Sequence, residues 1–290
     1  MITKKIIAIG CMALGLLGAV SCSSDDGPAR AELTMRVIDI AELSNGARYE
    51  AWIVVDNEPV SIGTFTSTDA DQKFSAIATQ LIEATSFFVT VETDNDPEPS
   101  DSRYFSGNFE GGKSAEVNVE KVIADFEDVS GKFVLQSPTD DNEDNDQNGI
   151  YFMDPSGFQI VPGLNLPSLK QGWRYQAWVR LGSSNQPVTT GKFDSPSGED
   201  ASSPYSGNGE APDFPGEDFD NTAPQGLTFP EDGDIRGKEV FITVEPEPDF
   251  DQSSPFGMQI LSGNAGQDLS PSINMMSRSF TGPRGTVSKD

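Results

Sequence analysis

Few residues in this sequence have side chains that could carry out catalysis. The chain of 290 residues contains no histidine, and its two cysteines are Cys11 and Cys22. Histidine is the commonest general base and metal ligand, and it usually activates a serine or cysteine nucleophile. The composition therefore argues against histidine-dependent hydrolysis and against metal sites built on histidine.

Two glutamates, Glu92 and Glu245, end the similar stretches FFVTVE and VFITVE. A glycosidase needs two carboxylates a few ångströms apart, and no pattern in the sequence brings these two together. The chain also has no Gly-x-Ser-x-Gly motif and no phosphate-binding glycine loop. The sequence therefore predicts no enzyme activity, no catalytic residues and no cofactor, and it favours structural hydrogen bonds for both glutamates.

The acidic stretch DDNEDNDQNG, residues 140–149, is the strongest candidate for a metal site. Asp144, Asp146 and Asn148 fit positions one, three and five of an EF-hand loop. Position twelve requires a bidentate acid, but Pro155 stands there, and no helical pattern flanks the stretch. A solvated hairpin loop is the favoured interpretation, and a looser calcium loop formed by these three residues is the alternative.

The first residues indicate export. Lys4 and Lys5 precede the apolar stretch 6–20, which is typical of a secretory signal. The tetrapeptide Ala-Val-Ser-Cys at residues 19–22 resembles a bacterial lipobox. The resemblance implies cleavage before Cys22 and lipidation of Cys22, for example with palmitate. An ordinary secretory signal is the alternative.

An acidic tether, residues 22–30, follows the cleavage site. Ser23 directly after the cysteine is similar to lipoproteins that are sent to the outer membrane. Asp25 and Asp26 resemble the export tag of surface-displayed lipoproteins, although a plain flexible linker also accounts for them. We therefore expect an exported protein, lipid-anchored to the outer membrane, with the side that it faces left open.

The charge of the chain restricts its partners. Asp and Glu number 46 against 19 Lys and Arg, which gives a formal net charge of −27. Such a chain repels the phosphate backbone, so nucleic-acid binding is not expected. Divalent cations and basic partners would be attracted, but solubility alone also explains the charge.

The sequence repeats one pattern twice. YEAWIVVDNEPVSIGTF (49–65) is matched by YQAWVRLGSSNQPVTTGKF (175–193), and both alternate apolar and polar residues with the period of a β-strand. Each reads as a hairpin and is followed by a Thr-Val-Glu strand and an acidic, proline-bearing loop. We predict an all-β, mainly antiparallel protein with two homologous sandwich-like domains, 31–125 and 126–290.

Two segments depart from the shared pattern. The second copy inserts the residues 195–234, which are rich in Pro, Gly, Ser and acids and predict a long irregular loop. In the first copy, Gln72 to Ala84 places apolar residues at helical spacing and predicts a short helix.

The repeated pattern resembles the extracytoplasmic C-terminal domain of anti-sigma-K factors. The shared features are a Tyr-x-x-Trp strand, a Pro-Val hairpin to Gly-x-Phe, a Val-Thr-Val-Glu strand and a final strand into Ser-Gly. The resemblance implies a β-rich fold and a location outside the cytoplasm. A signal peptide stands here where such regulators carry a cytoplasmic domain, so direct binding of a sigma factor is not expected.

The tryptophans complete the set of candidate residues. Trp52 and Trp178 occupy equivalent mid-strand positions, which predicts that both are buried between two sheets, with sugar stacking as the alternative. Trp173 has no counterpart in the first copy and is a candidate for the surface. The resulting hypothesis is a non-catalytic, lipid-anchored envelope protein that binds an unidentified protein or glycan. The alternatives are a periplasmic accessory of an anti-sigma system and a calcium-dependent adhesion or glycan-binding lipoprotein.

Overall fold

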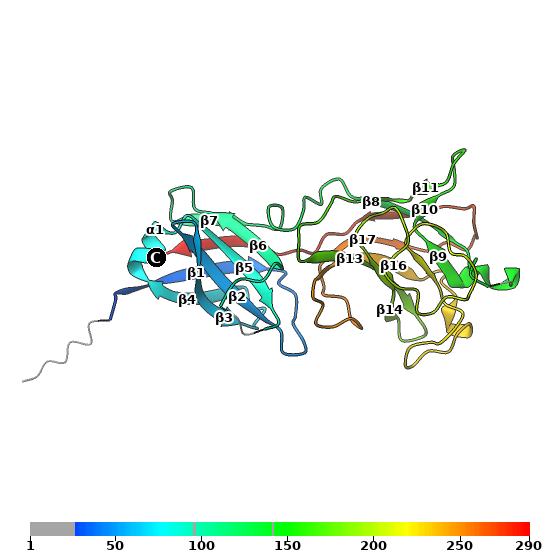
Figure 1. The fold of residues 1–290 in the computed structure, drawn as a ribbon, viewed down its shortest axis with the longest axis horizontal. Coiled ribbons are helices and arrows are strands. Elements are labelled where there is room, and N and C mark those ends of the chain that lie inside the picture. The colour runs from blue at the N-terminus through cyan, green and yellow to red at the C-terminus, as the bar shows by residue number, and fades with distance from the viewer. Residues whose placement is uncertain (1–26, 95–96, 141) are drawn as a thin grey trace, which may run out of the picture.

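The structure is a computed structural model that describes residues 27–94, 97–140 and 142–290. The described chain is built mainly from antiparallel strands, and its α-helical part is the single short helix α1 (Ala78–Glu83). Figure 1 shows two β-rich units arranged side by side along the long axis of the molecule. The prediction of an all-β, mainly antiparallel fold is confirmed.

The first unit is a sandwich of two four-stranded sheets. Leu33, Met35 and Val37 on one sheet and Tyr49, Ala51 and Ile53 on the other are completely buried in one apolar cluster. Alternate residues of each strand thus face the space between the sheets, as the period of two requires. In spatial order, one sheet contains β4 (Asp71–Ile77), β1 (Arg30–Ile38), β19 (Arg284–Lys289) and β7 (Ser114–Val117), and the other contains β3 (Glu58–Phe65), β2 (Arg48–Val55), β5 (Ser86–Glu92) and β6 (Arg103–Asn108).

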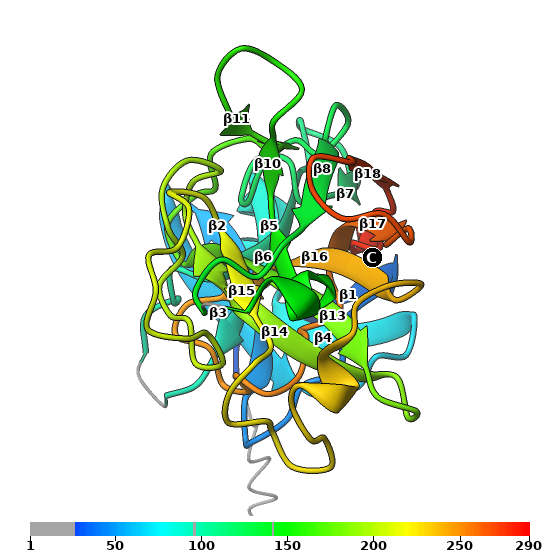
Figure 2. The same ribbon diagram turned by 90° about the vertical axis from the view of Figure 1, so that its right-hand side faces the viewer.

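The second unit is organised around one long antiparallel sheet, and Figure 2 shows the loops that wrap it. A two-stranded hairpin of β10 (Met153–Asp154) and β11 (Val161–Pro162) projects from this unit. The long sheet contains, in spatial order, β14 (Gln186–Phe193), β13 (Trp173–Leu181), β16 (Glu239–Pro246), β17 (Gln259–Asn264), β18 (Asn274–Arg278), β8 (Ser130–Leu135), β9 (Gly149–Tyr151) and β15 (Gly216–Asp218), with β12 (Leu164–Asn165) paired to β8.

The same four-strand arrangement occurs in both units. The order β3-β2-β5-β6 in the first corresponds to β14-β13-β16-β17 in the second. Tyr49 pairs with Phe65 and Tyr175 pairs with Phe193, and the register of each hairpin shifts at the Ala-Trp step that follows. The repeated sequence pattern therefore has a repeated strand geometry, down to the position of the bulge.

The C-terminal strand lies in the first unit. β19 pairs with β1 and with β7, so the chain returns to the first unit after completing the second. In Figure 1 this strand is the red arrow among the blue and cyan strands. The sequence had assigned these residues to the predicted second domain, 126–290, yet in space they complete the first sandwich.

Trp173 was predicted to be a surface residue, and this is wrong. Its side chain is 4% exposed, and its Nε1 donates a hydrogen bond of 3.0 Å to the carbonyl oxygen of Arg103 in the first unit. Its ring lies 5.9 Å from that of Tyr104 and 5.8 Å from that of Phe256. Trp173 has no counterpart in the first copy because it fills the contact between the two units.

The helix predicted over Gln72 to Ala84 is only half correct. β4 occupies Asp71–Ile77 and pairs with β1, and the helix is confined to Ala78–Glu83. Phe74 and Ala76 alternate toward the core, so strand pairing prevails over the helical spacing of the apolar residues. The loop 195–234 is irregular as predicted, apart from β15 and the 3-10 turn Glu231–Gly233.

Candidate functional site

The two repeated tryptophans belong to matching hydrogen-bonded arrays. Trp52 Nε1 donates to Thr90 Oγ1 at 2.9 Å, and Trp178 Nε1 donates to Thr243 Oγ1 at 2.8 Å. Each threonine hydroxyl donates in turn to the glutamate two residues further along the strand. Trp52 is 2% exposed and Trp178 is 1% exposed, so their burial is confirmed and neither has a free face for a sugar. Their predicted position in the core between two sheets is wrong, because neither belongs to the main apolar cluster.

These arrays lie on the face of each sheet that points away from the main apolar cluster. Residues 49, 51 and 53 belong to that cluster, and Trp52 does not. Trp52 stacks instead on Phe88, with 6.1 Å between the ring centres, and Trp178 stacks on Phe241, with 6.4 Å between the ring centres. The tryptophans are buried, but in a second layer that also contains a hydroxyl and a carboxylate.

Each glutamate at the end of an array closes a loop of its own unit. Glu92 Oε1 accepts from the Ser100 backbone N–H at 3.0 Å, and the carboxylate of Glu245 accepts from the Phe256 backbone N–H at 3.0 and 3.1 Å. Burial raises the pKa of Glu245 to about 7. The predicted structural hydrogen-bonding role of both glutamates is confirmed, and each acts within its own sheet.

A cluster of buried acids in the second unit was missed by the sequence analysis. Glu217 and Asp218 on β15 are completely buried. Loss of hydration raises the pKa of Glu217 to about 8, that of Asp218 to about 6 and that of Asp200 to about 7. The stretch GEDFD looks like a solvated acidic loop, so nothing in its composition indicated burial.

The calcium candidates do not form an EF-hand loop. Residues Glu143–Asn148 form a 3-10 turn, η1, in which Asp146 Oδ1 accepts from the Ser137 backbone N–H at 3.2 Å. Asn148 is 2% exposed, and its side-chain amide donates to the carbonyl oxygen of Pro230 at 2.7 Å. Asp144 is exposed. Over the described residues, no group of three or more His, Cys, Asp or Glu side chains is placed to hold a metal ion.

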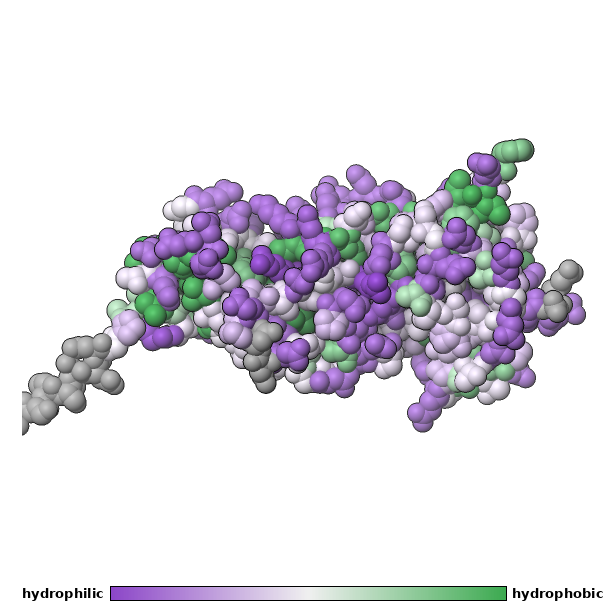
Figure 3. All heavy atoms as spheres, in the orientation of Figure 1, coloured by the Kyte–Doolittle hydropathy of each residue, from purple (hydrophilic) through white to green (hydrophobic). Residues whose placement is uncertain are grey.

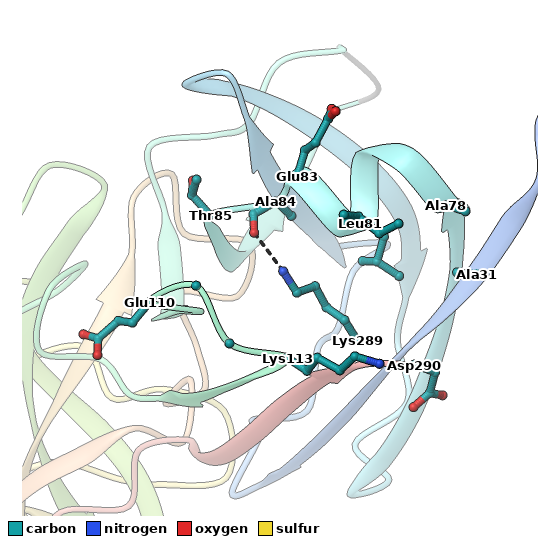
Figure 4. Close-up of a pocket in the computed structure, with 13 residues that line it drawn as sticks. Ala31, Ala78, Leu81, Glu83, Ala84, Thr85, Glu110, Lys113, Lys289 and Asp290 are labelled. Carbon is teal, nitrogen blue, oxygen red and sulfur yellow. Dashed lines mark hydrogen bonds between the residues drawn. The ribbon is translucent and has the colours of Figure 1, made fainter.

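An apolar pocket of about 800 Å³ opens at the end of the first unit (Figure 4). It is formed by α1, the turn at 110–113 and the C-terminal residues Lys289 and Asp290. Lys289 Nζ donates to the carbonyl oxygen of Ala84 at 3.0 Å, and Ile82 at the rim is 77% exposed. Figure 1 shows that the described chain begins at this same end of the molecule.

An exposed apolar loop lies at the opposite end. Phe158 is 105% exposed and Ile160 is 53% exposed in the turn between β10 and β11, and Val161 at the start of β11 is 47% exposed. Figure 3 shows apolar residues gathered near the base of this projecting hairpin, and further apolar patches over the first unit. Three neighbouring apolar side chains without cover are typical of a contact surface.

The first sandwich resembles a known protein family. Residues 18–103 match the family model of the anti-sigma-K factor RskA, C-terminal. The match covers β1 to β5 and reaches the first residue of β6, which is most of the first sandwich. Over this region, which is less than a third of the chain, the resemblance drawn from the sequence is confirmed. None of the curated proteins and none of the solved structures matches the chain.

Two expectations concern the membrane. No helix among the described residues is both long enough and apolar enough to cross a bilayer. Cys22, the predicted lipidation site, lies outside the described residues, as do Asp25 and Asp26.

Proposed function

We propose that this protein is an exported, lipid-anchored envelope protein that carries two tandem units related to the C-terminal domain of anti-sigma-K factors and binds a partner without catalysis. Acylated Cys22 attaches it to the outer membrane through the short acidic tether that precedes β1. Several acyl chains on one cysteine would hold the protein stably, whereas a single chain binds only marginally.

The tandem arrangement is supported by the repeated sheet. Each unit has the same order of four strands, a register shift at the same Ala-Trp step and the same Trp-Thr-Glu hydrogen bonds. The family match covers the first unit only, so the relation of the second unit depends on this geometry.

The observation that carries the binding function is the exposed loop at Phe158, Ile160 and Val161. These neighbouring apolar side chains are uncovered in the described chain, and an apolar patch that a partner covers would be removed from water at a gain in free energy. The loop lies at the end of the molecule away from the start of the described chain. With Cys22 anchored as proposed, the loop would be distal to the membrane. We infer a protein partner with an apolar groove and a basic rim.

Two measurements test the anchor and the orientation. Labelled palmitate should be incorporated into the wild-type chain and not into a Cys22→Ser variant, which should be recovered as an unanchored protein. Protease treatment of intact cells should degrade the protein if it faces outward and spare it if it faces the periplasm. Incorporation of label into Cys22→Ser would refute lipidation at that residue.

Site-specific photo-crosslinking tests the contact surface. A photo-reactive residue at position 158 should give a discrete crosslinked species in intact cells, and the same probe at exposed Asp144 should not. Absence of any adduct at 158, with the protein correctly located, would refute this surface.

A second candidate is supported by the family match. As a relative of anti-sigma factors, the protein could act as a periplasmic accessory to a membrane regulator. This function predicts protection from protease in intact cells and a changed output of a sigma-dependent reporter when the gene is deleted. Surface exposure without any reporter change would exclude it.

A further inference from the structure

Two carboxylates of the second unit converge on a single side-chain amide. Asn145 Nδ2 donates to Asp140 Oδ2 at 2.7 Å and to Asp220 Oδ1 at 2.8 Å. Asp140 precedes η1 and Asp220 follows β15, so residues far apart in the sequence meet here. Asn145 is only 9% exposed, and its Oδ1 is buried and accepts no hydrogen bond from the described residues.

The charge of these two carboxylates is not balanced by a basic side chain. They face a polar cavity of about 650 Å³, and no Lys or Arg is present among the described residues that line it. Burial, and then repulsion by Asp140, raise the pKa of Asp220. The cavity is also lined by Thr139, Asn142, Gly207, Asn208, Asn221 and Pro230.

We propose that this cavity binds a calcium ion between Asp140 and Asp220, with the side-chain oxygen of Asn145 as a third ligand. An amide's oxygen and nitrogen have nearly the same shape, so a half-turn of the Asn145 side chain would bring Oδ1 to the position of Nδ2. Nδ2 lies 2.7 Å from Asp140 Oδ2 and 2.8 Å from Asp220 Oδ1, so an oxygen at its position would adjoin both carboxylates. Calcium binds such oxygen ligands at about 2.3–2.6 Å.

The available ligands select the kind of cation. The cavity offers carboxylate, amide and backbone oxygens, and its open side admits water. Histidine is absent from the sequence, so metals that prefer imidazole are disfavoured. The ligands come from loops rather than from a rigid frame, which favours calcium over magnesium, because magnesium demands near-octahedral geometry.

This site differs from the one that the EF-hand spacing suggested. Asp144 is exposed, and Asp146 and Asn148 are engaged with Ser137 and Pro230. The proposal instead assigns Asp140, Asn145 and Asp220, and it does not depend on the proposed function.

Calcium titration of the whole chain, purified in detergent, tests the proposal. Millimolar calcium should raise the melting temperature by about 5–10 °C relative to EDTA, as expected for a ligand at roughly one hundred times its dissociation constant. Calorimetry should give one ion per chain. Asp220→Asn and Asp140→Asn should each lose most of the shift, whereas the control Asp144→Asn should retain it.

A variant that keeps all three oxygen ligands distinguishes loss of calcium binding from misfolding. Asn145→Asp adds a third carboxylate, so it should melt below the wild type in EDTA and show a larger shift with calcium. No calcium shift in the wild type, retention of the shift in both Asp140→Asn and Asp220→Asn, or its loss in Asp144→Asn would overturn the proposal. An equal shift with magnesium would overturn the choice of calcium.

Discussion

The two four-stranded sheets, β3-β2-β5-β6 and β14-β13-β16-β17, have the same internal geometry in different surroundings. In the first, Glu92 accepts a hydrogen bond from Ser100 in a short loop. In the second, Glu245 accepts from Phe256, and the nearby Asp249 forms an ion pair of 2.9 Å with Lys192. The Trp-Thr-Glu array is the same in both, so the sheet fixes the array and the loops are free to differ.

The loops also differ in whether they bury carboxyl groups. The long loop of the second unit brings Asp200, Glu217 and Asp218 out of water, with raised pKa values. Asp218 accepts from the Thr139 backbone N–H at 2.8 Å and from the Thr139 hydroxyl. We infer that the sheet supplies stability in both units, whereas the second unit gains sensitivity to protons and to cations.

The largest test of this comparison is removal of each tryptophan. Trp52→Ala and Trp178→Ala should each reduce the free energy of unfolding by about 3–5 kcal/mol, because each empties a buried aromatic site. Chemical denaturation measures the loss. Ile82→Ala is the control, since that side chain is 77% exposed and should change stability by less than about 0.5 kcal/mol. If either substitution left the free energy of unfolding unchanged, the two arrays would not be equivalent.

Removal of the central hydroxyl of each array should have a smaller effect. Thr90→Val and Thr243→Val keep the shape of the side chain but leave a buried indole N–H without an acceptor. We expect each to cost about 1–3 kcal/mol. Chemical denaturation of both variants provides the comparison. Costs that differ by more than 1.5 kcal/mol or so would show that the loops, and not the sheet, set the strength of the array.

The pH dependence of stability should come from the second unit. The folded-state pKa values of Glu217, about 8, Glu245, about 7, and Asp200, about 7, lie above those of unfolded carboxyl groups. The folded state therefore holds more protons between about pH 4.5 and 8, and stability falls as pH rises through that window. Thermal unfolding in EDTA should give a melting temperature several degrees higher at pH 5 than at pH 8.

Glu217→Gln sharpens this test. Glutamine resembles the protonated acid, so the variant should melt higher than the wild type at pH 8 and show a weaker dependence on pH. Glu83→Gln, a change on α1 in the first unit, is the matched control and should leave the dependence unchanged. A melting temperature that rises with pH in the wild type would contradict the assignment.

Local patterns in the sequence were enough to predict much of the fold. The hairpins and the repeated Thr-Val-Glu strands follow from alternation over five to nine residues. The burial of Trp52 and Trp178 followed from their equivalent mid-strand positions in the two copies. The place of strand β19 in the first unit was not foreseen, because RGTVSK contains one buried apolar residue, Val287, and its pairing with β1 spans the whole chain. Trp173 was misplaced for the same reason, since its partners lie in the other unit.

The candidate cation site was harder to foresee. The acidic stretches at 140–149 and 216–220 were visible, and the EF-hand spacing directed attention to Asp144, Asp146 and Asn148. Asp140 and Asp220 meet because β15 pairs with β9 at one edge of the long sheet, which brings the residues after β15 close to those before η1. No local signal specifies that pairing, because β15 is only three residues long.

The smallest test concerns two arginines that reach equivalent phenylalanines from different strands. The guanidinium carbon of Arg103 on β6 lies 4.5 Å from the ring centre of Phe88, and that of Arg180 on β13 lies 4.8 Å from that of Phe241. Replacing either arginine with alanine should cost about 0.5–1 kcal/mol, as expected for a cation over an aromatic ring near the surface. Arg180 also pairs with Glu239 at 2.9 Å, but that ion pair is partly open to solvent and should add little. Double-mutant cycles with Phe88→Leu and Phe241→Leu isolate each contact. Coupling in only one unit would mean that the shared phenylalanine, and not the cation above it, is what the two sheets have in common.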